Sequence, residues 1–518
     1  MTQFFANQSI RRLFFGLMVV VVGLANLAAS AQDQTYDTLP MAEKYVLPDT
    51  EEPVIDPDDP NQKAKPRSDA YRKVENLRRQ DKTAALEALK AGKVAEAATY
   101  LTDFLFPEMT QQNEQVLSDL GKLRDEFNRF VIATSGASRK SFIETVCFPT
   151  LKTIAEGNYH PSARLNAILI IGSLNDVDTS TGIAPTPNAE CVKYLLGLTE
   201  KADAAEFLLV GAFTGLHRVA EIESIQRRIE QGDLDRMFKM ALATVQNKGP
   251  GQDKLSAEVS YWLKRRSAQI LGSLKNKGQN NETSTALMAI VADKNVKDLL
   301  RIDAMEALKE VGIDKANAES LIDTLIAFAA EQLESEAVGI RRRVEEYVTV
   351  GLLLDDTYII DSKSFEPGNN SKTGGDKPGA GTGGGAEGGD EENQNKGSTK
   401  GERKPGFDLP NHALNTIRRK AKAYLYQFHR TFSEESLTKE LAAADKDRVR
   451  KALRIIERAL KDTDIGLVDL GKKPDAKTPY EEELKTNSVS DLMYERFMAA
   501  STEMKALKRK IEDPADTK

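Results

Sequence analysis

Residues that commonly carry chemistry are scarce in this chain of 518 residues, which contains two cysteines, four histidines and one tryptophan. The chain has no CxxC pair, no GxSxG turn and no glycine run that ends in Gly-Lys-Ser/Thr ahead of a helix. No pair of histidines has the HExxH spacing that places two metal ligands on one helix face; they are His160, His217, His412 and His429. We therefore predict that the protein is not an enzyme and holds neither a cofactor nor a metal.

Aromatic residues are also few, at 6%, whereas charged residues make up 29% and hydrophobic residues 40% of the chain. This balance is typical of helical proteins, and the length is sufficient for two or three domains. The net charge of −7 lacks the basic excess that general nucleic-acid binding requires. We therefore expect no nucleic-acid partner.

The N-terminus predicts export. Arg11-Arg12 precedes an apolar run, Leu13 to Ala29, and Ala29-Ser30-Ala31 is a small-x-small cleavage signal. We predict a signal peptide at 1–31, cleaved between Ala31 and Gln32, and a periplasmic or extracellular protein. Seventeen residues span about 25 Å as a helix, less than the roughly 30 Å hydrocarbon core, which favours cleavage over a retained anchor. The arginine pair also resembles a twin-arginine export signal.

Between residues 138 and 355 an apolar helical pattern is followed five times by a turn and a second helix. The second helices fall at 160–174, 207–216, 263–274, 299–308 and 339–352. Aligned on Ala167, Ala212, Ala268, Ala304 and Val344, they are 45, 56, 36 and 40 residues apart. Helix-pair repeats of roughly 40–47 residues have this kind of period. Because one hairpin cannot bury its own apolar face, we expect neighbouring hairpins to stack.

This pattern resembles the HEAT/armadillo superfamily, most clearly at Pro161–Leu174 and Leu299–Leu308. The resemblance implies an all-α protein in which residues 137–360 form an α-solenoid whose product is binding surface. Small residues on the second helices would let their backbones approach closely. The chain departs from the pattern at Phe207–Leu216, which lacks the arginine, and at Val344, where alanine is usual. An irregular all-helical bundle is the alternative.

Four further segments surround the repeats. Residues 32–66 combine nine acids with six prolines and predict a disordered acidic arm. Residues 67–136 predict a helical N-terminal cap, with one possible tetratricopeptide-like hairpin closed at Gly92. Residues 366–406 contain 13 glycines and predict a disordered tether of roughly 35 Å. Residues 407–518 show three amphipathic helices, which predict a small C-terminal bundle.

Cys147 and Cys191 leave two interpretations open. An exported protein meets an oxidising environment, in which a disulfide is chemically possible. However, neighbouring helices lie roughly 8–10 Å apart, whereas a disulfide requires Cα atoms within about 7 Å. We therefore doubt this bond and favour two small buried hydrophobic residues.

Two basic clusters are the candidate binding residues. Arg265, Arg266, Arg341, Arg342 and Arg343 lie at second-helix starts and could line one edge of a solenoid groove. Arg418, Arg419 and Lys422 lie on the helix at 414–430, whose basic and aromatic residues could meet an anionic lipid, an anionic glycan or an acidic partner. For both clusters the alternative is an ordinary solvated or internally bonded helix face.

Two functions remain from the sequence. The first is a non-enzymatic scaffold that binds a protein or peptide partner in the cell envelope through its repeats. Its tether would hold a second module at a high effective concentration. The second is an all-helical protein that binds or processes cell-wall glycan. Neither the partner nor the oligomeric state follows from the sequence.

Overall fold

The computed structural model describes residues 35–48, 68–178, 184–312, 315–353, 408–434, 441–467, 483–485 and 487–508. The fold is all-α, as predicted; the two short strands β1 (Asn175–Val177) and β2 (Thr186–Pro187) form an antiparallel pair. The chain divides into two compact units, residues 1–312 and 313–518. Among the described helices, none combines the length and apolar character needed to cross a membrane. The predicted signal peptide with its Ala31/Gln32 cleavage site and the predicted tether lie outside the described residues.

The first unit begins with α2 (Asp69–Lys90) and a second helix, α3 (Val94–Tyr100). Gly92 ends α2 with a left-handed φ of +75°, and the amides of Gly92 and Lys93 donate to the carbonyls of Leu89 and Ala88 at 2.9 and 2.8 Å. This is the Schellman arrangement, in which glycine avoids the steric cost of positive φ. A helix, a glycine turn and a helix therefore occupy the residues where the sequence predicted them.

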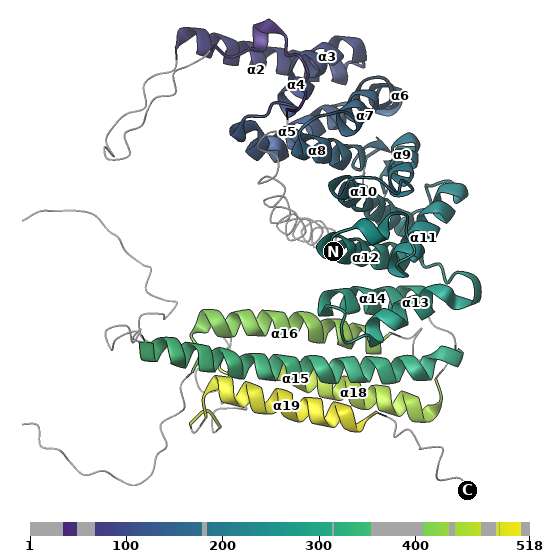
Figure 1. Ribbon diagram of the computed structural model, residues 1–518, viewed down its shortest axis with the longest axis vertical. Helices are drawn as coiled ribbons and strands as arrows, with labels where there is room; N and C mark the ends of the chain where they lie inside the picture. The colour runs from purple at the N-terminus through teal and green to yellow at the C-terminus, as the bar shows by residue number, and fades with distance from the viewer. Residues whose placement is uncertain are drawn as a thin grey trace, which may run out of the picture. The chain divides into compact units, whose positions relative to one another are not determined.

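Five helical hairpins follow in chain order (Figure 1). The first joins α3, the π turn η2 (Leu101–Leu105) and α4 (Phe106–Met109) to α5 (Glu114–Ala133). The second joins α6 (Gly136–Phe142), the π turn η3 (Ile143–Cys147) and α7 (Phe148–Glu156) to α8 (Pro161–Ile171). The others pair α9 (Ala189–Thr199) with α10 (Glu206–Ile225), α11 (Gln231–Val245) with α12 (Ala257–Leu274), and α13 (Glu282–Ala292) with α14 (Asp298–Val311).

These hairpins stack on their neighbours. Second helices contact one another in the order α5, α8, α10, α12 and α14, and first helices in the order α9, α11 and α13. Four of the five hairpins predicted from the sequence are therefore present, and the predicted N-terminal cap contributes a further one.

Small residues lie where second helices approach most closely. A Cβ atom added to Gly172 would lie 2.8 Å from the Cα of Gly215, at the contact of α8 with α10. A Cβ atom on Gly272 would lie 2.9 Å from the Cα of Ala307, at the contact of α12 with α14. Larger side chains would force these helices apart, so the small residues set their separation.

Side-chain caps fix where several helices begin. The side-chain oxygens of Ser68, Asn113, Asn188 and Ser256 each accept the amide of the residue three positions later, at 2.9–3.4 Å. Such caps satisfy amides that have no partner within the helix. His160 caps α8 in a related way, because its Nδ1 accepts the amide of Ser162 at 3.2 Å and Pro161 follows at the first helical position.

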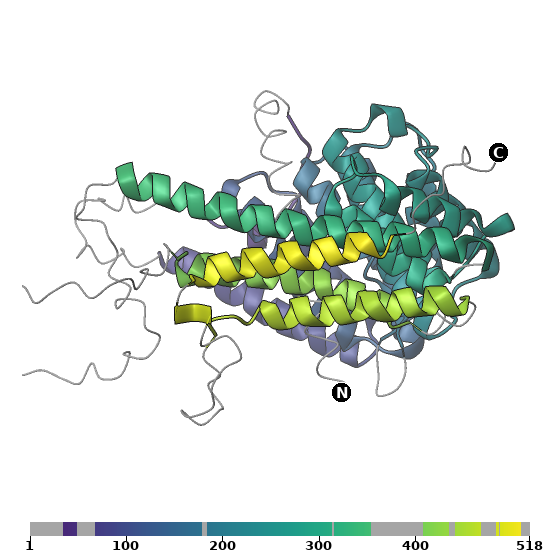
Figure 2. The same ribbon diagram turned by 90° about the horizontal axis from the view of Figure 1, so that it is seen from below.

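In the described part of the second unit, four long helices form a bundle (Figures 1 and 2). They are α15 (Lys315–Leu353), α16 (Asn411–Phe432), α18 (Ala443–Asp462) and α19 (Val489–Ala506), with the short turn η8 (Glu483–Lys485) before the last. Helix α15 contacts each of the other three, and the rings of Phe328 and Phe428 meet edge to face at 5.1 Å. Ser501 on α19 donates to the carbonyl of Ala330 at 2.8 Å.

The prediction was wrong at the end of the repeats. The expected fifth hairpin is the single 39-residue helix α15, and it belongs to the second unit. Its apolar positions from Leu321 to Ile340 stay buried along one continuous helix, without a proline to end it. The boundary expected at residue 360 therefore lies at 312, and the bundle expected at 407–518 has α15 as a fourth helix.

Candidate functional site

An N-terminal segment, which we call the N-terminal arm (residues 35–48), contacts the first hairpins of unit 1. It is extended except for the 3-10 turn η1 (Glu43–Tyr45). The sequence predicted disorder for residues 32–66, but 35–48 make ordered contacts with the helices. The feature of the sequence that would have predicted order is the concentration of apolar and aromatic residues in 35–48. They include Tyr36, Leu39, Met41 and Tyr45. The acids and prolines that dominate the composition of residues 32–66 are mostly in 49–66, which lies outside the described residues.

The start of the arm pairs with the turn between α7 and α8 through its backbone. The amide of Asp37 donates to the carbonyl of Asn158 at 2.7 Å, and the Asn158 side-chain amide donates to the carbonyl of Thr35 at 3.3 Å. Asp37 also forms a parallel bridge with Tyr159. Main-chain pairing of this kind recognises an extended segment with little regard to its side chains.

The middle of the arm meets polar groups at the π turn η2 and at the end of α4. The amide of Leu39 donates to Thr110 Oγ1 at 2.9 Å, at the end of α4, and the amide of Ala42 donates to the carbonyl of Asp103 at 3.0 Å. Gln112 Nε2 donates to an arm carbonyl, that of Tyr36, at 2.6 Å. These contacts hold the arm extended over the first hairpin.

Two aromatic residues anchor the arm. Tyr45 is 1% exposed, and its ring centroid lies 6.0 Å from that of Tyr100 and 5.3 Å from that of Phe104. Its hydroxyl donates to Asp81 Oδ2 at 2.7 Å, and Arg78 Nε donates to its backbone carbonyl at 3.0 Å. Burial, together with the hydrogen bond to Asp81, raises the pKa of the Tyr45 hydroxyl. The pocket thus contacts the ring, the hydroxyl and the carbonyl of one tyrosine.

The second anchor, Tyr36, is half-buried and meets the ring of His160 edge to face at 5.3 Å. The two anchors are nine positions apart in the sequence. Together they define a site for an extended segment with two aromatic residues.

The predicted binding residues Arg265 and Arg266 join hairpins to one another. Arg265 Nε donates to Asp303 Oδ2 at 2.6 Å, which links α12 to α14. Arg266 Nη1 lies 3.4 Å from His217 Nδ1 on α10, and its guanidinium carbon lies 5.0 Å from the centroid of the Trp262 ring. Burial lowers the pKa of Arg266. Both arginines therefore take part in the packing of unit 1.

Arg341, Arg342 and Arg343 do not lie at a second-helix start, because they are within α15 of the second unit. Arg341 and Arg342 each pair with the glutamate four residues later, Glu345 and Glu346, at 3.5 Å. These three arginines therefore do not belong to a repeat hairpin, on which their place beside Arg265 and Arg266 was predicted, and the binding role of the five arginines stays a prediction.

The basic helix predicted at 414–430 is α16, and much of its charge is used within the bundle. Arg418 is 5% exposed and donates to the carbonyl of Ile465 at 2.7 Å. Lys422 Nζ lies 2.6 Å from Asp464 Oδ1, and Lys420 Nζ lies 2.6 Å from Glu336 Oε1 on α15. Arg419 is exposed. Arg418 and Lys422 are therefore bonded within the bundle, and the binding role of this helix stays a prediction.

Cys147 in η3 and Cys191 in α9 are both free and buried. Burial raises the pKa of both thiols. No disulfide joins them, and both side chains pack as small hydrophobic residues.

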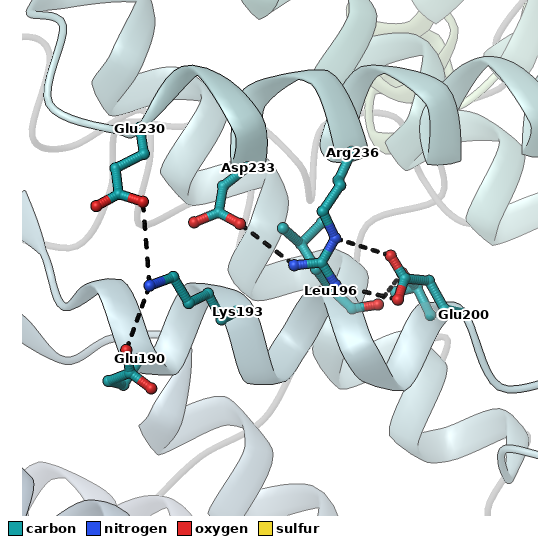
Figure 3. A network of polar contacts seen from close by, with 8 residues as sticks. Glu190, Lys193, Leu196, Glu200, Glu230, Asp233 and Arg236 are labelled. Atoms are coloured by element: carbon teal, nitrogen blue, oxygen red, sulfur yellow. Dashed lines mark hydrogen bonds and ion pairs between the residues drawn. The ribbon is translucent and has the colours of Figure 1, made fainter.

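A network of charges closes the contact between α9 and α11 (Figure 3). Arg236 on α11 makes two parallel bonds to Glu200, both at 3.0 Å, and a third bond to Asp233 at 3.2 Å. Lys193 Nζ lies 3.4 Å from Glu190 and 4.0 Å from Glu230. Two-point arginine–carboxylate pairing fixes geometry as well as charge, so this network holds consecutive hairpins in register.

The next contact, between α11 and α13, is more open. A groove of about 420 Å³ lies between α11 and the segment that precedes α13, with Phe238 and Leu242 among its apolar lining. Its rim carries both signs of charge, with Lys239 and Lys248 opposed by acids, so it does not select a ligand by charge. We place the candidate site at the N-terminal arm, where bound chain is present.

Among the described residues, no group of three histidine, cysteine or acidic side chains is placed to hold a metal ion. Comparison with known proteins found no family model, no curated protein and no solved structure that matches this chain.

Proposed function

We propose that this protein is an exported, non-enzymatic scaffold whose repeat unit binds an extended segment of a protein partner in the cell envelope. The observation that carries the proposal is the N-terminal arm. The hairpins hold the 14 residues of the arm through main-chain hydrogen bonds and one buried tyrosine, and the arm is extended except for its 3-10 turn at Glu43–Tyr45. This is the physical task that binding a partner peptide would require.

The resemblance to helical-repeat proteins supports the same function. Stacked hairpins expose a row of helix ends and turns, and the arm uses two of these turns, at Thr110 and at Asn158. The four-helix bundle of residues 313–518 would serve as a second module that binds another partner or a second copy of the chain.

The glycan alternative has less support. Its motivation is the basic face of α16, and Arg418 and Lys422 on that face bond to the carbonyl of Ile465 and to Asp464 within the bundle. Protein binding is therefore the function that we favour.

Affinity capture tests the proposal. The chain Gln32–Lys518 would be immobilised and exposed to an envelope extract. Two variants would be treated in the same way. Tyr45→Ala empties the tyrosine pocket, and Tyr45→Ala/Arg78→Ala also removes a side chain that lines this pocket. We expect one or two proteins in stoichiometric amounts on the Tyr45→Ala chain and less on the double variant. Retention of wall polymer alone, or of nothing, by all three chains would contradict the proposal.

A further inference from the structure

The helices beneath the N-terminal arm contact one another directly. Helix α2 contacts α3 and α5, α4 contacts α5, and α7 contacts α8. Most of the arm stays at least partly exposed, and Tyr45 is its one buried side chain. The site is therefore built by the hairpins, and the arm occupies it.

The connection to α2 leaves room for the arm to depart. Nineteen residues, 49–67, join Pro48 to Ser68. Arg78 lies ten residues into the helix from Ser68, or about 15 Å along its axis. Nineteen residues can span up to roughly 60 Å, so the connection is longer than docking requires.

We propose that residues 35–48 are an internal competitor, filling a site that receives a tyrosine-bearing extended segment of a protein partner. This inference rests on the proposed scaffold function. It adds the chemistry of the partner segment and the way in which the arm regulates access to the site. The partner segment needs an extended backbone to pair with Asn158 and an aromatic side chain against His160. Nine positions later, at the end of a turn like η1, it needs a tyrosine for the pocket of Arg78 and Asp81.

The arm competes well for the site because residues 49–67 attach it to the same chain. A short linker gives an attached ligand an effective concentration on the order of 1 mM. If a free segment of the same sequence binds at about 20 µM, the attached arm weakens its binding roughly 50-fold. A partner therefore gains access when the arm is released or when its own segment binds more tightly.

The test uses a fluorescent peptide with the sequence of residues 34–48 and the full chain, with binding followed by anisotropy. We expect the peptide to bind Tyr45→Ala protein at micromolar concentration and wild-type protein roughly 50-fold more weakly. A peptide that has alanine at the position of Tyr45 should not bind the Tyr45→Ala protein. Tyr45→Ala/Arg78→Ala protein should bind the normal peptide more weakly, because the contact to its carbonyl is lost.

A second variant retains Tyr45 and guards against misfolding. A specific protease site inserted within 49–67 of the full chain would be cleaved after purification. Excess unlabelled peptide should then release the cut arm, whereas the uncut protein should resist. An arm that stays bound after cleavage, or a peptide that fails to bind Tyr45→Ala protein at 1 mM, would overturn the inference. Equal affinity for wild-type and Tyr45→Ala protein would also overturn it, as would a wild-type dimer with exchanged arms.

Failure of this inference differs from failure of the proposed function. A partner captured equally by wild-type and Tyr45→Ala chains, and not displaced by the peptide, would retain the scaffold and exclude the arm site. A peptide that binds as expected while neither chain captures a partner would establish the internal contact and contradict the scaffold.

Discussion

In residues 1–312, helices contact chiefly their own hairpin and the adjacent ones, whereas in residues 313–518 a single helix, α15, contacts three helices that follow the predicted tether. Gly172 and Gly215, in consecutive hairpins, set the contact of α8 with α10. Ser501 and Ala330, bonded in the bundle, are 171 positions apart.

The difference has a consequence for stability. Units that stack on nearest neighbours gain stability hairpin by hairpin, so damage to one contact should spread only to adjacent hairpins. A four-helix bundle shares one core, so damage to that core should affect all of its helices. Three predictions test this contrast, and a fourth concerns the arm of unit 1.

The largest effect is expected in the bundle core. Phe428 is 1% exposed and packs against Phe328, so Phe428→Ala should cost about 3–5 kcal/mol of unfolding free energy in unit 2. Hydrogen exchange of the full chain should show joint loss of protection in α15, α16, α18 and α19. Tyr426→Ala, at a side chain that is 54% exposed on the same helix, is the matched control. Loss confined to α16 would contradict a shared core.

A smaller and more local effect is expected at a hairpin contact. In Gly215→Ala the added Cβ would lie 2.9 Å from the Cα of Gly172 and 2.7 Å from Leu195 Cδ1, which should cost about 1–3 kcal/mol. Exchange should increase in α8 and α10 but not in α14. Gly197→Ala is the control, because a Cβ there meets nothing within 4 Å. Equal loosening of the whole unit would count against nearest-neighbour stacking.

The arginine clusters provide a third comparison. Arg265→Gln removes the ion pair to Asp303, which is 6% exposed and keeps its bond from Gln269, and should lower the unfolding free energy by about 1–2 kcal/mol. Arg342→Gln removes the exposed ion pair to Glu346 within α15 and should change the unfolding free energy by less than about 0.5 kcal/mol. Chemical denaturation of the two variants measures the difference. Equal effects would mean that the link between α12 and α14 adds no stability.

The smallest effect is expected from pH at the start of the arm. Burial lowers the pKa of His160 below its ordinary value of about 6.5, so the folded protein binds this proton less readily than the unfolded chain. The stability from neutral His160 is present above pH 6.5 and is lost as pH falls from 6.5 through the lowered value. Protonation also removes the Nδ1 acceptor for the Ser162 amide.

Hydrogen exchange, corrected for its intrinsic pH dependence, should therefore show residues 35–39 loosening between pH 7 and pH 5. His160→Asn keeps a helix-capping side chain without a titrating group and should abolish the change. Loosening that persists in His160→Asn would assign the effect to another group.

The sequence predicted most of unit 1, because its hairpins are local. Gly92, Pro161 and the small residues Ala167 and Gly172 mark turns and close contacts within short windows. Helix α15 was divided because Gly339 and the arginines after it imitate a second-helix start. Only contacts with α16, α18 and α19 show that the helix continues.

The arm was missed for a related reason. Its partners Arg78, Thr110 and Asn158 are tens of residues away, and no local pattern marks them. The pairing of Arg265 with Asp303 was also invisible, since it depends on the stacking of α12 against α14.

The arm also orders events during synthesis. Thr35 and Asn158, which bond across its start, are 123 positions apart. Hairpins of unit 1 can form as their residues leave the ribosome, because domains commonly fold from the N-terminus onward. The arm emerges before its partners and cannot complete its contacts until residue 160 has emerged. The arm is thus among the last segments to join the first two hairpins, and it can dock fully only when both are complete.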